Sequence, residues 1–190
     1  RLRLCACHPR LYDPNSRLPS SKLERLLEIV EELRAEGHRA LVFSQFTSHL
    51  ALVREALRAR GVAHLYLDGQ TPPKERDALV RRFQAGEGDL FLVSLKAGGT
   101  GLNLTAADYV VHLDPWWNPA VEDQATDRAH RIGQDKPVTV LRLVTKGTIE
   151  EAILALHAEK RALVAGVLEG GADGGPIGTE ELLELLRADF

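Results

Sequence analysis

Methionine is absent from this 190-residue sequence, only two cysteines occur, and aromatic residues make up 5% of it. The cysteines, Cys5 and Cys7, lie too close together to form the disulfide framework of a small secreted domain. The longest apolar runs are a few residues, whereas a membrane-spanning helix needs ~20, and no signal peptide is recognisable. The sequence therefore predicts neither a secreted disulfide scaffold nor an association with a membrane.

Two motifs that hold nucleotides are also missing. The sequence contains no Gly-x-x-x-x-Gly-Lys-Ser/Thr loop, whose backbone amides would surround the phosphates of ATP. It also has no Asp-Glu pair at the end of an expected strand that could bind magnesium. We therefore expect the chain by itself to be inactive towards ATP. Because it begins at Arg1 and lacks methionine, we expect it to be a fragment of a longer protein.

The composition is that of an ordinary globular domain. Hydrophobic residues make up 44% of the chain and charged residues 27%, which is enough apolar surface for one core. The net charge of −3 is unevenly spread, because residues 166–190 carry six acids and one base, which leaves +2 on residues 1–165. A mildly basic body permits DNA binding in a local groove, although the overall charge argues against a strongly basic nucleic-acid coat.

Short apolar stretches alternate with segments of helical periodicity along most of the sequence. Two capping boxes, Ser21-x-x-Glu24 and Thr148-x-x-Glu151, would start two of the helices. Strands that alternate with helices predict an open parallel sheet with helices on both faces. The expected strands are 40–43, 63–67, 90–94, 109–113 and 138–144, and the expected helices are 21–36, 47–60, 71–86, 118–132 and 148–165.

The expected helix at 118–132 carries the most informative polar residues. It opens with Asn118-Pro119, an N-cap residue followed by a proline suited to the first turn. At ~100° per residue, Gln124, Arg128 and Arg131 share one face. The expected packing face lies about 100° away and consists of Val121, Ala125, Ala129 and Ile132. Two arginines on one face suit a phosphate, because each guanidinium donates two parallel hydrogen bonds.

A plainer interpretation is that these arginines only pair along the helix. Asp127 and Arg131 are spaced i, i+4, and such a surface pair is worth ~0.2–0.5 kcal/mol. Taken alone, a face of this kind is more often solvated than functional. The surrounding motifs favour the functional interpretation.

Six motifs together resemble the second motor lobe of Swi/Snf-type DNA-dependent ATPases. They occur in the order of that family and cover the chain up to about residue 165. The motifs are Leu4-Cys-Ala-Cys-His-Pro9, Leu41-Val-Phe-Ser-Gln-Phe46, Leu67-Asp-Gly-Gln-Thr71 with Arg76, Ser94-Leu-Lys-Ala-Gly-Gly-Thr-Gly-Leu-Asn-Leu104, Asp114-Pro-Trp-Trp-Asn-Pro119, and Asp123-Gln-Ala-Thr-Asp-Arg-Ala-His-Arg-Ile-Gly-Gln134.

The resemblance implies a RecA-like α/β lobe that completes an ATPase site. Arg128 and Arg131 would be arginine fingers that reach the γ-phosphate of ATP, and Gln124 would orient them or the attacking water. Asp127 would hold an arginine in place. ATP and Mg²⁺ would be held mainly by the first RecA-like lobe of the same chain. The resemblance also implies that Gly99 and Gly101 bring backbone amides towards the ATP cleft.

The same resemblance implies that double-stranded DNA is a partner, with a DNA-bound protein as a further target of remodelling. Ser94 and Lys96 would face DNA phosphates. Weaker candidates for the same groove are Ser44, Gln45, Thr71 and Lys74. Polar residues at strand ends also cap helices, so this second group has a purely structural alternative.

The predicted organisation has five segments. They are a lead-in at 1–20, the RecA-like lobe at 21–147, a bracing helix at 148–165, a glycine-rich linker at 166–178 and an acidic helix at 179–190. The last two have no firm family counterpart, so their role stays open. A composition rich in alanine, leucine and arginine weakly indicates a bacterial source. That predicts a cytoplasmic or nucleoid location, or a nuclear one if the source is eukaryotic.

Three other site interpretations fail. The glycines at 98–101 do not form a dinucleotide-binding fingerprint, because position 104 is leucine where a third glycine is needed. Trp116 and Trp117 are expected to pack rather than to stack on bases. Cys5-x-Cys7-His8 lacks the second ligand pair of a structural zinc site, so no metal site is expected.

Two rival functions belong to other classes. A stand-alone nucleotide- or phosphate-binding module would bind nucleotide measurably without a partner lobe. A protein-interaction domain that had kept the fold and lost the chemistry would have lost Gln124, Arg128, Arg131 and the glycine loop at 98–101. All of them are intact.

Overall fold

The computed structural model describes residues 1–97 and 102–168, and its centre is a parallel sheet in the order β2-β3-β1-β4-β5. The strands are Ala40–Ser44 (β1), His64–Leu67 (β2), Leu90–Ser94 (β3), Tyr109–His112 (β4) and Thr139–Arg142 (β5). Every neighbouring pair is parallel. The expected strands match these within two residues at each end, and the predicted parallel α/β architecture is confirmed.

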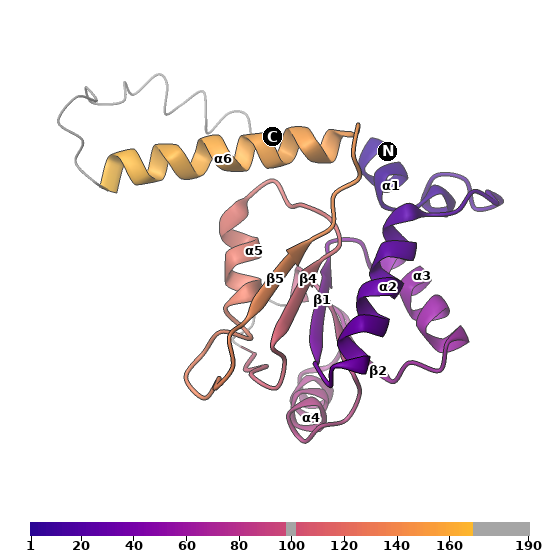
Figure 1. Ribbon diagram of the computed structural model, residues 1–190, viewed down its shortest axis with the longest axis vertical. Helices are drawn as coiled ribbons and strands as arrows, with labels where there is room; N and C mark the ends of the chain where they lie inside the picture. Colours follow the sequence, from indigo (N-terminus) through magenta and orange to yellow (C-terminus); the bar gives the residue numbers. More distant parts are fainter. Residues whose placement is uncertain (98–101, 169–190) are drawn as a thin grey trace.

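Helices cover both faces of the sheet (Figure 1). They are α1 (Leu2–Cys7), the 3₁₀ turn η1 (Pro9–Leu11), α2 (Ser21–Ala35), α3 (Thr47–Ala59), α4 (Pro73–Gln84), α5 (Pro119–Thr126) and α6 (Ile149–Leu168). Successive residues of a strand point to opposite faces. Val42 of β1 therefore packs in the core with α2 and α3, and Phe43 packs with α4 and α5. In the part of the chain that the structure describes, no helix is long and apolar enough to span a bilayer.

Local capping differs in detail from the expected pattern. The hydroxyl that caps α2 belongs to Ser20 and not Ser21, since Ser20 Oγ accepts from the backbone N–H of Leu23 at 3.2 Å. Before α6, Thr148 Oγ1 accepts from the N–H of Glu150, at 3.3 Å. The carboxylate of Glu151 accepts from the N–H of Gly147, at 2.8 Å. In both contacts the donor N–H lies one residue before the one that the predicted capping box would use.

The helix α6 continues to Leu168, three residues beyond the end expected at 165. The first residues assigned to the glycine-rich linker are therefore helical. The remainder of that linker and the expected acidic helix lie outside the described residues.

A buried ion pair joins α2 to α6, which lies across one end of the lobe beside α1 (Figure 1). Lys22 Nζ in α2 lies 2.6 Å and 2.5 Å from the two carboxylate oxygens of Glu150 in α6. Both side chains are almost fully buried. Glu150 also accepts from the N–H of Thr145, at 2.9 Å, and the Thr145 hydroxyl donates to the carbonyl of Ala6, at 2.8 Å. These contacts attach α6 to the lobe through polar groups that water does not reach.

Removing one partner of this pair should destabilise the fold, because it leaves the other charge buried and unpaired. We expect Lys22→Met to lower the free energy of unfolding by ~3–5 kcal/mol, and Lys22→Met/Glu150→Gln to recover part of that loss. Equilibrium denaturation in urea measures both values. The exposed pair Arg25–Glu28 is the matched control, and Arg25→Met should leave the free energy of unfolding almost unchanged because solvent screens an exposed pair. Equal losses at the two sites would contradict the prediction.

Candidate functional site

An open polar groove of about 490 Å³ runs along the carboxyl ends of β1, β2 and β3. Ligands bind at this edge of parallel α/β sheets because the loops that follow the strands converge there. The groove is lined by Gln45, Thr47, Ser48, Ala51, Tyr66, Asp68, Gly69, Gln70, Ser94 and Lys96. Three of the predicted DNA-binding residues, Gln45, Ser94 and Lys96, are thus brought together. Lys96 is exposed and Ser94 is almost fully buried at the base.

The other three predicted DNA-binding residues stand elsewhere. Ser44 is buried and its hydroxyl donates a short hydrogen bond to the carboxylate of Asp114, so it positions a neighbour and does not line the groove. Asp114 also accepts from the backbone N–H of Gln45, at 3.1 Å. Lys74 is exposed on α4 and lines neither groove described here. Thr71 lines the neighbouring groove.

Asp68 shapes the loop between the two grooves. Its Oδ1 accepts from the N–H groups of Gln70 and Thr71, at 2.9 and 3.1 Å, and its Oδ2 accepts from the hydroxyl of Tyr66, at 2.8 Å. Burial works to raise the pKa of Asp68, but these hydrogen bonds outweigh it and lower that pKa. Burial and the contact with Asp68 raise the pKa of Tyr66 to about 12. The loop therefore presents a fixed carboxylate and a neutral phenol.

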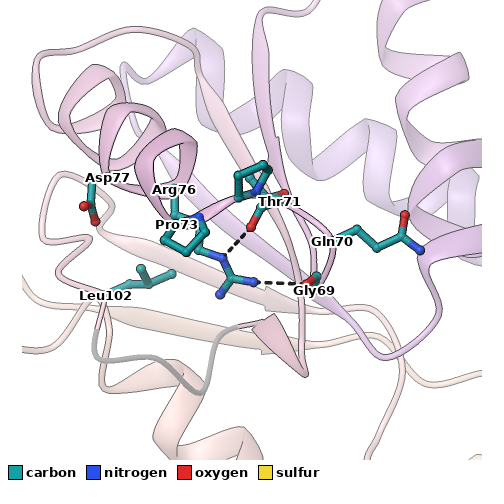
Figure 2. Close-up of a pocket in the computed structure, with 8 residues that line it drawn as sticks. Gly69, Gln70, Thr71, Pro73, Arg76, Asp77 and Leu102 are labelled. Atoms are coloured by element: carbon teal, nitrogen blue, oxygen red, sulfur yellow. Dashed lines mark hydrogen bonds between the residues drawn. The ribbon is translucent and has the colours of Figure 1, made fainter.

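A second groove of about 570 Å³ adjoins the first and shares Gly69 and Gln70 with it (Figure 2). Arg76, from α4, crosses this groove and donates to the backbone carbonyls of Thr71, Asp68 and Gly69 at 2.9, 3.2 and 3.3 Å. Its guanidinium therefore clamps the loop in the shape that both grooves require. The sequence placed Arg76 in a motif, but this clamping role follows only from the tertiary contacts.

The arginine pair does not lie on a helix as predicted. The helix α5 begins at Pro119, with the Asn118 side chain accepting from the N–H of Ala120, at 3.1 Å, as expected. It ends at Thr126, six residues short of the expected end, and Arg128 and Arg131 lie in the turns that follow. The helical-wheel prediction is therefore wrong beyond Asp127. Ile132, expected to pack on the sheet, is fully exposed, whereas Ala125 and Ala129 are buried as predicted.

Gln134 explains why the helix ends early. Its side-chain amide donates to the carbonyls of Thr105, Ala107 and Ala129, at 3.0, 2.7 and 3.2 Å. The backbone N–H of Leu104 also donates to the carbonyl of Arg128, at 2.9 Å. These bonds satisfy the carbonyls of a tight turn and hold it against the segment that leads into β4. No local propensity in the sequence signals an anchor of this kind.

The two arginines differ in exposure. Arg131 is exposed, together with Gln124 and Asp127, whereas Arg128 is only 3% exposed. Burial lowers the pKa of Arg128, the positive charge of Arg131 lowers it further, and Asp127 opposes both effects. The Nε of Arg128 finds no hydrogen-bond partner among the residues that the structure describes. The predicted ATP-cleft glycines, Gly99 and Gly101, lie outside those residues.

Trp116 packs as the sequence predicted, whereas Trp117 is partly exposed. Trp116 packs against the core beside α4 and α5, and its carbonyl has a short hydrogen bond with His157 of α6. Trp117 is 39% exposed. The guanidinium of Arg3 lies 5.7 Å from the ring centroid of Trp116 and 5.2 Å from that of Trp117, which is a cation–π distance. The lead-in segment is therefore bound to the segment before α5.

His112 connects the end of β4 to α5. Its Nε2 lies 3.1 Å from Thr126 Oγ1 at the end of the helix. Burial lowers the pKa of His112 to about 4, although Glu122 opposes this effect. Glu122, fully buried, is paired with Arg142 at 2.9 Å. The end of α5 therefore packs on a neutral imidazole.

This burial makes the lobe sensitive to acid. A histidine in the unfolded chain has a pKa of 6.5, whereas the pKa of His112 in the folded lobe is about 4. The stability that neutral His112 contributes to the folded state is therefore complete above pH 6.5. It is lost as the pH falls towards 4, and the loss in the free energy of unfolding reaches about 3 kcal/mol. The free energy of unfolding of His112→Asn should fall less steeply over this interval than that of the unaltered protein. His130→Asn, at an exposed position, should follow the unaltered profile, and parallel profiles for all three would contradict the assignment.

The parallel sheet, the carboxyl-edge groove and the arginine-bearing turn define a RecA-like α/β lobe of the helicase type. The solved C-terminal part of the Fun30 ATPase domain has the same fold, with a TM-score of 0.71 and 34% identity over 80% of this chain and 52% of that one. Residues 21–133 match the family of helicase conserved C-terminal domains. The chain belongs to that family, in its Swi/Snf-type form.

Relatives of known name support the assignment. YwqA of Bacillus subtilis, named as an ATP-dependent helicase/translocase, is 42% identical over 191 residues, which is 97% of this chain and 21% of YwqA. The chromatin-remodeling ATPase INO80 of Aspergillus oryzae is 46% identical over 157 residues, which is 82% of this chain and 11% of INO80. The chain thus spans about a fifth or less of the length of these relatives.

Proposed function

We propose that this chain is the second motor lobe of an ATP-dependent translocase that moves along double-stranded DNA. In this proposal, ATP and Mg²⁺ are held mainly by a first RecA-like lobe, and the present lobe supplies arginine side chains to the γ-phosphate. The groove at the carboxyl ends of β1–β3 contacts DNA phosphates. The observation that carries the proposal is an anchored, exposed arginine turn on a lobe that has a separate polar groove.

The arginine turn suits phosphoryl transfer because that reaction is accelerated mainly by positioning and by stabilising charge. Gln134 and the bond from Leu104 to Arg128 hold the turn by contacts within the lobe. Arg131 is the exposed member of the pair, while Arg128 is buried beside it. We infer that Arg131 contacts the phosphate first and that Arg128, whose Nε is unsatisfied, reorients when the lobes close.

The groove suits a DNA backbone because its polar groups are neutral or cationic at the exposed side. Lys96 and Gln70, which are both exposed, can contact phosphate oxygens without reading a base, as expected of a protein that travels along DNA. Asp68 is the exception, but its carboxylate is occupied by the Tyr66 hydroxyl and by backbone N–H groups. Asp68 therefore shapes the loop, and in this proposal the neighbouring side chains bind the phosphates.

One short segment contacts the arginine turn and the second groove. Leu102 lines that second groove beside Arg76 (Figure 2), and the N–H of Leu104, two residues later, donates to the carbonyl of Arg128. A movement of the arginine turn would therefore displace the wall of the second groove, which shares Gly69 and Gln70 with the proposed DNA groove. We infer that this segment couples closure around ATP to the grip on DNA.

Removing the exposed arginine should abolish hydrolysis while DNA binding persists. In a longer protein that contains both lobes, we expect Arg131→Ala to lower DNA-stimulated ATP hydrolysis by ~10³–10⁵-fold, because the transition-state charge loses its partner. Arg131→Lys should recover only part of the lost ATP hydrolysis, because lysine lacks the planar guanidinium that donates two parallel hydrogen bonds. Arg58→Ala, at an exposed position of α3, is the control. Hydrolysis that survives Arg131→Ala would refute the assignment.

Removing the groove lysine should weaken DNA binding without altering sequence preference. We expect Lys96→Ala to lower DNA affinity and to reduce the slope of log K against log salt by about 0.9, the value expected when the protein neutralises one phosphate fewer. The measurement is fluorescence anisotropy over a salt series on two unrelated duplexes. Lys136, which pairs with Asp108 away from the groove, is the matched control. An unchanged slope for Lys96→Ala would remove Lys96 from the DNA interface.

A further inference from the structure

Three potential metal ligands meet beneath the lead-in segment, outside the grooves and the arginine turn. Cys7 ends α1, His49 lies in the first turn of α3, and Asp114 follows β4. One ligand atom from each lies within 4.8 Å of the other two. Their exposed fractions are 1%, 1% and 3%. The fold thus gathers a thiol, an imidazole and a carboxyl group from three distant segments into one interior position.

His49 is the anomaly in this cluster. Neither ring nitrogen has a hydrogen-bond partner within the described part of the chain. Its Nδ1 lies 3.9 Å from Asp114 Oδ1, which is beyond hydrogen-bond distance. The Cys7 thiol has only a long contact, 3.9 Å, with Glu150. Buried polar side chains normally have a partner because an unsatisfied one costs free energy. The three side chains therefore meet in the interior without satisfying one another.

We propose that Cys7, His49 and Asp114 bind one zinc ion. A thiolate, an imidazole nitrogen and a carboxylate oxygen are each ordinary zinc ligands, and three protein ligands leave one tetrahedral position for water. Sulfur and nitrogen donors select against magnesium and calcium, which prefer all-oxygen sites. The expectation of no metal site considered only ligands close in sequence. Cys5 is exposed and takes no part in this cluster.

The charges around the cluster are compatible with a dication. A thiolate and a carboxylate together neutralise Zn²⁺. Lys22 is already neutralised by Glu150, at 2.5 Å, and the half-exposed Arg3 donates to the carbonyl of Pro115, at 2.7 Å. Burial raises the pKa of the Cys7 thiol, so zinc binding must displace its proton to solvent.

The carboxylate is already oriented by its neighbours. The Ser44 hydroxyl donates to Oδ1 of Asp114, and the N–H of Gln45 donates to Oδ2. Groups that hydrogen-bond a ligand in this way hold it in position for a metal. Gln45 also lines the groove. A zinc ion would therefore fasten the lead-in segment to the same carboxylate that positions one edge of the groove.

The test uses the purified chain after metal removal with a chelator, followed by titration with Zn²⁺. We expect one equivalent of zinc per chain, together with a Tm that rises with zinc concentration and does not rise with Mg²⁺. Cys7→Ser and His49→Ala should each weaken zinc binding by more than the ~10–100-fold typical for losing a group that only orients a ligand. Cys5→Ser is the matched control and should bind like the unaltered chain.

Cobalt substitution gives a readout that needs no variant. Co²⁺ bound to Cys7 should produce a sulfur-to-metal charge-transfer band, which Zn²⁺ then abolishes by displacement. Absence of that band, binding well below one equivalent, or equal zinc affinity in Cys7→Ser would each overturn the proposal. Equal zinc affinity in Cys7→Ser would instead indicate that the zinc binds to histidines at the surface. The test involves neither ATP nor DNA, so its outcome is independent of the proposed motor function.

Discussion

Parallel pairing of β1 with both β3 and β4 is the constraint on which the remaining structure depends. A central parallel strand has both faces covered, so β1 is buried along its whole length and helices must occupy both sides. Parallel order also sends the loops after β1, β2 and β3 to the same edge. The polar groove is therefore a consequence of the sheet order, and its residues come from three separate strand ends.

Asp114 shows how a single buried carboxylate organises the region above that edge. It follows β4 and holds the hydroxyl of Ser44 and the N–H of Gln45, which follow the neighbouring strand β1. Burial works to raise its pKa, but the nearby imidazole of His49 acts through its charge, and together with the hydrogen bonds from Ser44 and Gln45 it outweighs burial and lowers that pKa. The lead-in segment closes over this carboxylate, and α6 is bound beside it through Glu150 and Lys22. The segments outside the sheet are therefore attached to the lobe by polar contacts in its interior.

The arginine turn depends on a different anchor. A helix that continued to residue 132 would carry Arg128 and Arg131 on one regular face, whereas the Gln134 amide stabilises a tight turn instead. That turn exposes Arg131 and buries Arg128, whose carbonyl accepts from the segment that leads into β4. The same segment reaches the second groove, beside Arg76, at Leu102. The arginine turn and the second groove are thereby joined through a few residues of backbone.

The succession of the five strands and of helices α2 to α6, their limits to within three residues except at the end of α5, and the family itself were determined by the sequence alone. Apolar periodicity and the Asn118 cap are local signals that need no knowledge of distant contacts. The early end of α5, the burial of Arg128 and Ser44, and the meeting of Cys7 with His49 and Asp114 were decided only by the tertiary structure. Each of these depends on groups far apart in the chain, and local propensity is overridden where such groups satisfy one another's hydrogen bonds or share one buried position.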